Sequence, residues 1–241
     1  MKTLHIVSIF YSHIELLEYQ YNSLLKYLPQ DIIPIFHYGI SSNDENERQS
    51  AIAFCNKNNL EYTLCWNDMP NDWNWNNHPF ALNKIIYNLD YLDFFSDIMI
   101  LDTDCFPTKD MTEILDIYYK DGYLHHVEPS YPHCGSRILP FIMIEKLYYL
   151  LRCNFSDFII GDTHYDVGAL LCPELKKPSN LFYKKIFLDN ILETEKKKWS
   201  NMQERYELFQ DNFLHLCGYS HTKRNSSLQE TIDKALLLFR K

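Results

Sequence analysis

The chain has 241 residues, a hydrophobic content of 46% and a formal net charge of −9. This length lies at the upper end of what one α/β domain holds, and the hydrophobic content is ample for a sizeable core. An acidic chain is a poor candidate for nucleic-acid binding, because such binding depends on basic side chains that neutralise phosphates. The charge remains compatible with an anionic ligand that is bound through a metal ion.

The seven cysteines are scattered along the chain, and no Cys-x-x-Cys spacing occurs. This usage indicates a reduced, cytoplasmic protein and argues against a disulfide framework or a zinc site. The first ten residues are too short and too polar at their flanks for a signal peptide. No run approaches the roughly 18 apolar residues of a membrane-spanning helix, so we expect no transmembrane segment.

The first half of the chain alternates between strand-like and helix-like patterns. We expect strands over 4–10, 32–38 and 61–66. We expect one helix over 14–28 and a second helix that follows the polar loop 39–46 and ends near residue 59. Residues 52–54 of the second helix should face inward. Pro34 predicts an edge or a bulge in the second strand. This βαβαβ order predicts a parallel, doubly wound sheet, and a further helix over 79–92 leads into the next strand.

Two carboxylates follow that next strand directly. Ile98 to Leu101 is an apolar run typical of a strand buried on both faces, and Asp102 and Asp104 come at its carboxyl end. Ligands of open α/β sheets bind at the carboxyl ends of strands. Residues two apart share a face of a strand, so both carboxylates could reach one hard divalent cation that also holds a phosphate. The alternative is that both acids only face water.

The second half has fewer strong patterns. We expect helices over 111–119, 138–152, 180–198 and 228–239, a strand over 123–127 and a loop over 128–133. No internal repeat, low-complexity stretch or linker occurs. We therefore expect one domain over 1–241.

This order of elements, ending in Asp102-Thr103-Asp104, resembles the GT-A class of nucleotide-sugar glycosyltransferases. Lys84 stands where a basic residue often meets the donor phosphate or sugar in related enzymes. The segment 165–171 (Tyr-Asp-Val-Gly-Ala-Leu-Leu) is similar to the small-residue segment that lines the donor sugar pocket. His215-Leu216-Cys217-Gly218 resembles the C-terminal His-x-x-Gly whose histidine completes the metal site.

The resemblance implies a single, Rossmann-like GT-A domain that moves a sugar from a nucleoside-diphosphate sugar to a glycan, lipid or protein acceptor. It implies a nucleotide-donor half at 1–104 and an acceptor and metal-completing half at 105–241. It implies Asp102, Asp104 and His215 as the ligands of Mn²⁺ or Mg²⁺. An imidazole ligand suits Mn²⁺, since Mg²⁺ prefers oxygen. By its apolar surroundings in the sequence alone, His215 would instead be a core histidine.

Three further positions are candidates for binding the donor. Gly218 lets the backbone approach a phosphate closely. The retaining family closest to this pattern has a lysine three residues after that glycine, whereas here the position is His221, with Lys223 two residues further on. Either side chain could neutralise the phosphate. Tyr11 could stack on the nucleotide base, or pack in the core or at its rim.

An inverting transferase also needs a general base for the acceptor hydroxyl. Asp166 and Asp211 are the candidates. Asp211 would share a face with His215 if it begins a helical turn. A retaining enzyme need not have such a base, and the sequence leaves the stereochemistry open.

Two other classes fit parts of the sequence. A Mg²⁺-dependent phosphatase also uses Asp-x-Asp, but such enzymes usually carry Thr or Val where Phe106 stands, and they place the motif on the first strand. The other class is a non-catalytic carbohydrate- or protein-binding domain on the same fold.

Overall fold

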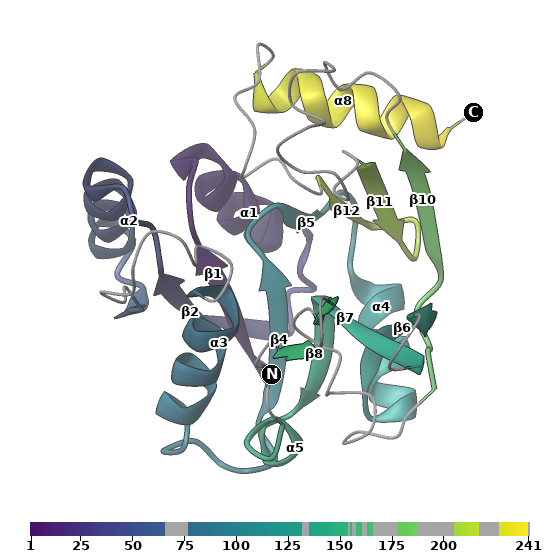
Figure 1. Ribbon diagram of the computed structural model, residues 1–241, viewed down its shortest axis with the longest axis horizontal. Coiled ribbons are helices and arrows are strands. Elements are labelled where there is room, and N and C mark those ends of the chain that lie inside the picture. Colours follow the sequence, from purple (N-terminus) through teal and green to yellow (C-terminus); the bar gives the residue numbers. More distant parts are fainter. Residues whose placement is uncertain are drawn as a thin grey trace.

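The computed structural model of the protein is shown in Figure 1. It describes residues 1–65, 77–131, 135–153, 155, 158–160, 163–165, 178–187, 205–216 and 227–240. Among these residues, no helix combines the length and the apolar character that crossing a bilayer requires.

Six strands form the central sheet. They are β1 (Lys2–Phe10), β2 (Ile32–Ile40), β3 (Glu61–Leu64), β4 (Asp97–Asp102), β6 (Leu124–Tyr131) and β7 (Gly135–Lys146). Their order is β3-β2-β1-β4-β7-β6. The first four are parallel to one another, β7 is antiparallel to β4, and β6 is antiparallel to β7. The prediction of an α/β fold with a mainly parallel sheet is confirmed.

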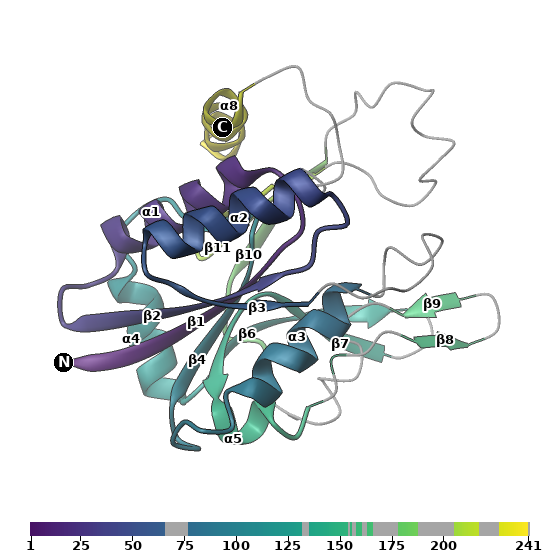
Figure 2. The same cartoon turned by 90° about the vertical axis from the view of Figure 1, so that its left-hand side faces the viewer.

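Helices cover both faces of this sheet (Figure 2). One face packs against α1 (Ile14–Tyr27), α2 (Glu45–Lys57) and α4 (Thr112–Asp121), and the other against α3 (Asn77–Asn88) and α5 (Leu147–Leu150). Alternation along β1 supplies both cores, because Leu4, Ile6 and Phe10 point to the first face while Val7 and Ile9 point to the second.

A second, antiparallel sheet begins directly after the acid pair. Its strands are β5 (Cys105–Pro107), β10 (Tyr183–Phe187), β11 (Arg205–Phe209) and β12 (Phe213–His215), in the order β10-β11-β12-β5. The C-terminal helix α8 (Leu228–Phe239) packs on it through Ile232 and Ala235 (Figure 1). A short hairpin of β8 (Phe158–Ile160) and β9 (Thr163–Tyr165) forms a third sheet.

The direction of strand addition reverses beside β1. From β1 the chain adds β2 and then β3 on one side, and it then crosses through α3 to place β4 on the other side. The carboxyl ends of β1 and β4 therefore flank a topological switch point, where open α/β sheets bind their ligands. Asp102, the last residue of β4, lies at this position.

The helix predicted over 138–152 is wrong. Strand β7 runs to Lys146, and only a single short helix, α5, follows it. Ile142 and Ile144 enter the core on one face of the sheet, while Met143 enters the core on the other. A strand buried on both faces is apolar at every position, so its periodicity does not distinguish it from a buried helix.

Smaller parts of the prediction also need correction. Residues 183–187 of the helix predicted over 180–198 form β10, and 188–198 lie outside the described residues. Residues 128–131 continue β6 where a loop was expected. In α2, Ala53 faces solvent, and Ala51 and Cys55 are buried.

The expectation for Pro34 holds locally. Strand β2 lies inside the sheet, but β3 pairs with it only from His37 onward. Pro34 therefore belongs to the part of β2 that pairs with β1 alone, where the missing N–H of proline leaves no ladder bond unmade.

Gly122 ends α4 and provides a test of the backbone conformation there. Its φ is 76°, and a Cβ placed on it would meet no atom within 4 Å. We expect Gly122→Ala to lower the free energy of unfolding by about 1 kcal/mol, from backbone strain alone. Gly122→Asn should cost less, because asparagine tolerates the left-handed conformation better than alanine. Urea denaturation measures both, and an alanine variant as stable as the wild type would contradict this conformation.

Candidate metal centre

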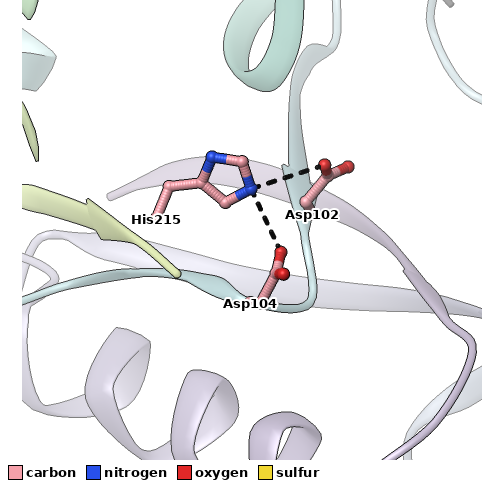
Figure 3. A group of neighbouring side chains, drawn as sticks. All are labelled: Asp102, Asp104 and His215. Atoms are coloured by element: carbon pink, nitrogen blue, oxygen red, sulfur yellow. Dashed lines mark ion pairs between the residues drawn. The ribbon is translucent and has the colours of Figure 1, made fainter. Parts of the chain in front are cut away.

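The three residues predicted as metal ligands converge at the end of β4 (Figure 3). Nε2 of His215 lies 3.2 Å from Oδ1 of Asp104 and 4.0 Å from Oδ2 of Asp102. One ligand atom from each residue lies within 4.8 Å of the other two. Two carboxylates and one imidazole in this arrangement could hold a divalent cation.

Hydrogen bonds to the backbone hold Asp102 and Asp104 in place. The two acids were expected to lie on one face of a regular strand, but the strand ends before Asp104. β4 ends at Asp102, and a tight turn leads into β5. Nε2 of Gln20, on α1, donates to the carbonyls of Asp102 and Cys105 at 2.7 and 2.8 Å. Oγ1 of Thr103 donates to the carbonyl of Ile9 at 2.8 Å. Two of these bonds are buried and the bond to Asp102 is partly buried, and together they fix the turn against α1 and β1.

The β11–β12 hairpin delivers His215 to the acid pair. Its three-residue turn, 210–212, places Glu207 directly opposite His215 in the antiparallel register. Opposite residues share one face of a sheet, and Nδ1 of His215 donates to Oε2 of Glu207 at 2.7 Å. A carboxylate on Nδ1 directs the lone pair of Nε2 towards a metal, as in many metal sites. The N–H of Leu216 donates to the carbonyl of Asp104 at 2.9 Å and ties this strand to the turn.

The centre is buried and strongly negative. Glu207 is 0% exposed, His215 2% and Asp104 7%. Burial opposes the imidazolium form of His215, but the carboxylates of Asp104 and Glu207 outweigh it and raise its pKa well above the ordinary value. Three carboxylates around one imidazole retain negative charge even when His215 is protonated, so the residues fit a divalent cation.

Cys105 is buried beside the acid pair. Burial, and then the charges of Asp102, Asp104 and Glu207, raise the pKa of its thiol well above the usual value. Without a metal the thiol therefore stays protonated and is a poor nucleophile. Cys105 is not among the three residues whose ligand atoms converge.

A second imidazole approaches the other oxygen of Asp102. His78 lies in the first turn of α3, and its Nε2 is 3.4 Å from Oδ1 of Asp102. Its side chain is 36% exposed, whereas that of His215 is 3% exposed. The side chain of His78 is thus much more exposed than that of His215.

Tyr11 and Lys84 lie near the same carboxyl edge of the sheet. Tyr11 directly follows β1; burial raises the pKa of its hydroxyl, and a side-chain hydrogen bond with Asn43 opposes the rise. Nζ of Lys84 donates to the carbonyl of Leu64, the last residue of β3, at 2.7 Å. Their contacts with a base or a phosphate stay predictions.

Asp211 does not begin a helical turn, so that expectation is wrong. It lies in the turn of the β11–β12 hairpin, with a φ of 49°, and its carboxylate pairs with Lys184 at 2.6 Å. His215 lies at the other end of β12, so the two residues do not share a helical face. This position gives no geometric support to Asp211 as a base. Asp166, Gly218, His221 and Lys223 lie outside the described residues.

Sequence reasoning did not select Gln20, Glu207 or His78 for this site. For Glu207 a signal exists, because a hairpin turn at Gln210-Asp211-Asn212 pairs positions 207 and 215. For His78 the signal is its helical spacing to the buried Ala81 and Leu82. No local pattern marks Gln20, since its partners are backbone carbonyls more than 80 residues away.

No family model and no curated protein matches the chain. Solved structures with a similar fold include S. aureus TarS, at 13% identity and a TM-score of 0.41 over 66% of this chain. They also include the mannosyltransferase PcManGT of Pyrobaculum calidifontis in complex with GDP-Man and Mn²⁺, at 13% identity and a TM-score of 0.33 over 46% of this chain.

Mouse xyloside xylosyltransferase 1 is a third similar structure, at 11% identity and a TM-score of 0.39 over 63% of this chain and 69% of its own. Our chain spans 30% of the TarS chain and 30% of the PcManGT chain. At these identities the likeness concerns the fold alone.

Metal affinity should rise with pH. Below the raised pKa of His215, a metal ion must displace the proton from Nε2, so binding releases a proton. We expect the Mn²⁺ affinity of the wild type to rise about tenfold per pH unit over the neutral range. Calorimetry in buffers of different ionisation enthalpy measures the proton release directly. An affinity that does not change with pH would contradict this protonation state.

Glu207 should support the metal without binding it. Glu207→Gln keeps an oxygen to accept the Nδ1 hydrogen bond but removes the negative charge that strengthens His215 as a ligand. We expect Mn²⁺ affinity to fall by about tenfold or more. Glu145→Gln, at an equally buried glutamate on β7, is the matched control and should bind as the wild type does. Equal losses in both variants would point to general damage.

Proposed function

We propose that the protein is a metal-dependent glycosyltransferase that moves a sugar from a nucleoside-diphosphate sugar to an acceptor hydroxyl. The observation that carries this proposal is the convergence of Asp102, Asp104 and His215 at the switch point of the sheet. A cation centre at this position can hold the diphosphate of a donor whose nucleotide lies along the carboxyl ends of the parallel strands.

The proposed chemistry follows from the charge of the leaving group. A nucleoside diphosphate leaves poorly unless its negative charge is offset, and a bound divalent cation supplies this as a Lewis acid. Asp102, Asp104 and His215 would hold the cation, and Glu207 would fix the orientation of the imidazole. The mixed oxygen and nitrogen ligand set favours Mn²⁺ over Mg²⁺.

Other residues would bind the donor. Lys84 would add positive charge beside the phosphates after exchanging its bond to the carbonyl of Leu64. Gly218 and either His221 or Lys223 remain our candidates for a phosphate contact, and Tyr11 for stacking on the base. The roles of Lys84 and of His221 or Lys223 follow from the resemblance of the sequence to GT-A enzymes. Those of Tyr11 and Gly218 follow from the position of Tyr11 after the first strand and from the backbone freedom of glycine.

The reaction on the acceptor side depends on stereochemistry. An inverting reaction requires a base near the acceptor hydroxyl, and Asp166 is our first candidate. Asp211 would have to leave Lys184 to serve in its place. We further propose that residues 1–104 bind the nucleotide, that 105–241 hold the acceptor and complete the metal site, and that the acceptor is a glycan, lipid or protein.

Asp104→Ala tests the metal centre with the donor. We expect the wild type to bind a nucleoside diphosphate or its sugar only with Mn²⁺, and Asp104→Ala to weaken this binding by more than about a hundredfold while the protein stays folded. Asp116→Ala, at an exposed acid on α4, is the control. Calorimetry against a panel of nucleoside diphosphates and their sugars measures the affinities.

Two outcomes would contradict the proposal. Donor binding that is equally tight in excess EDTA would show that the metal centre does not hold the donor. Hydrolysis of phosphate monoesters, without slow hydrolysis of a nucleotide sugar, would make the protein a phosphatase.

A further inference from the structure

We infer that His5 and His37 form an acid-sensitive pair, which holds the strand β3 on the sheet at neutral pH and releases it in acid. Both histidines lie on the face of the sheet that packs against α3. His5 shares its face of β1 with Val7, and His37 lines a groove with Ile85 of α3. Release of β3 in this way does not depend on the proposed function, because no metal ligand takes part in it.

A chain of hydrogen bonds links three neighbouring strands through this pair. Nδ1 of His5, on β1, lies 2.9 Å from Nε2 of His37, on β2. Nδ1 of His37 lies 2.9 Å from Oε2 of Glu61, which is the first residue of β3 and stands directly opposite His37 in the register. The hydroxyl of Tyr91 donates to the same carboxylate oxygen at 3.3 Å. His5 is 6% exposed and His37 5%, so the bond between them is shielded from water.

The proton positions in this chain follow from the carboxylate of Glu61. An ionised carboxylate only accepts hydrogen bonds, so Nδ1 of His37 carries a hydrogen. In the neutral pair, Nε2 of His37 therefore accepts and Nδ1 of His5 donates. One added proton keeps this bond, because the protonated ring can donate while the neutral ring accepts. A second added proton leaves a hydrogen on both facing nitrogens, and the bond is lost. The closed pair therefore takes up one proton at most.

The surroundings of the pair oppose even the first added proton. Burial lowers the pKa of both histidines, and the charge of Glu61 offsets this only in part. For His5 the carboxylate of Asp97 on β4 also opposes the decrease in pKa, and Glu145 on β7 lies two strands away in the same row of the sheet. The pair is therefore neutral at pH 7. The groove beside His37 is also lined by three tyrosines and by apolar or amide side chains of α3: Tyr38, Tyr62, Tyr91, Ile85, Asn88 and Leu89.

Acid therefore favours a state in which the pair is open. Histidines exposed to water take up protons below their ordinary pKa of about 6.5, and the closed pair takes up fewer. The stabilisation by the pair is complete above that pH and is lost as the pH falls below it. β3 is the element most affected, because it has four residues and pairs with β2 alone among the described strands. It also carries the Leu64 carbonyl that accepts from Lys84, so release of β3 frees Lys84 as well.

Amide hydrogen exchange of residues 61–64 in the full chain, measured between about pH 7.5 and about pH 5, tests this inference. After correction for the intrinsic exchange rate, we expect the opening constant of β3 to rise about tenfold per pH unit below about pH 6.5, since opening takes up one proton. His5→Asn should reduce this to less than about threefold per pH unit, because its amide stands where Nδ1 stood and its oxygen can accept from protonated His37. His13→Asn removes a histidine outside the pair, at the start of α1, and is the control that should behave as the wild type.

Nitrogen-15 spectra of the histidine rings count the protons directly and need no substitution. We expect at most one imidazolium between His5 and His37 as long as the amides of β3 stay protected. Two imidazolium signals from the pair in a protein with a protected β3 would overturn the inference. So would an opening constant of β3 that does not change with pH, or a His5→Asn variant with the pH dependence of the wild type. An equal reduction in His13→Asn would overturn it too, because the effect would then not belong to the pair.

Discussion

Three carboxylates surround one buried imidazole at the carboxyl ends of β1 and β4, and this concentration of negative charge constrains the structure around it. Buried like charges are costly unless they are paired or bind a cation. His215 partly offsets Asp104 and Glu207 from the second sheet. The hairpin that carries His215, the turn that carries the acids and the helix that holds the turn must therefore keep their relative positions.

The halves of the chain meet at this centre. The first half supplies the parallel strands and the acid pair, while β12 supplies His215 from more than a hundred residues later and pairs with β5 through a short ladder. A site assembled from two sheets depends on the packing between them. Phe213, on β12, belongs to the same core as Phe10 and Leu17 on β1 and α1, so apolar burial holds the imidazole in place.

Much of the fold could be predicted from local patterns. A helix was predicted over 228–239, and α8 has these bounds; the capping box of Ser227 and Glu230 at its start is a local signal of this helix. Strand β7 could not be predicted, because a strand that is buried on both faces of a sheet shows no hydrophobic periodicity. The acid pair could be predicted as a candidate site because it directly follows the apolar strand Ile98 to Leu101. Glu207 and His78 leave only weak local signals, a hairpin pairing and a helical spacing. Gln20 leaves none, because its contacts are with backbone carbonyls of distant elements.

The most direct test of the metal centre is the position of the ion itself. Crystals grown with Mn²⁺ and a nucleoside diphosphate, measured at the manganese absorption edge, locate the metal by anomalous scattering. We predict one peak within coordination distance, roughly 2.0–2.3 Å, of an oxygen of Asp102, an oxygen of Asp104 and Nε2 of His215, with the diphosphate on its open side. A peak elsewhere, or a bound diphosphate with no metal between these residues, would contradict the account.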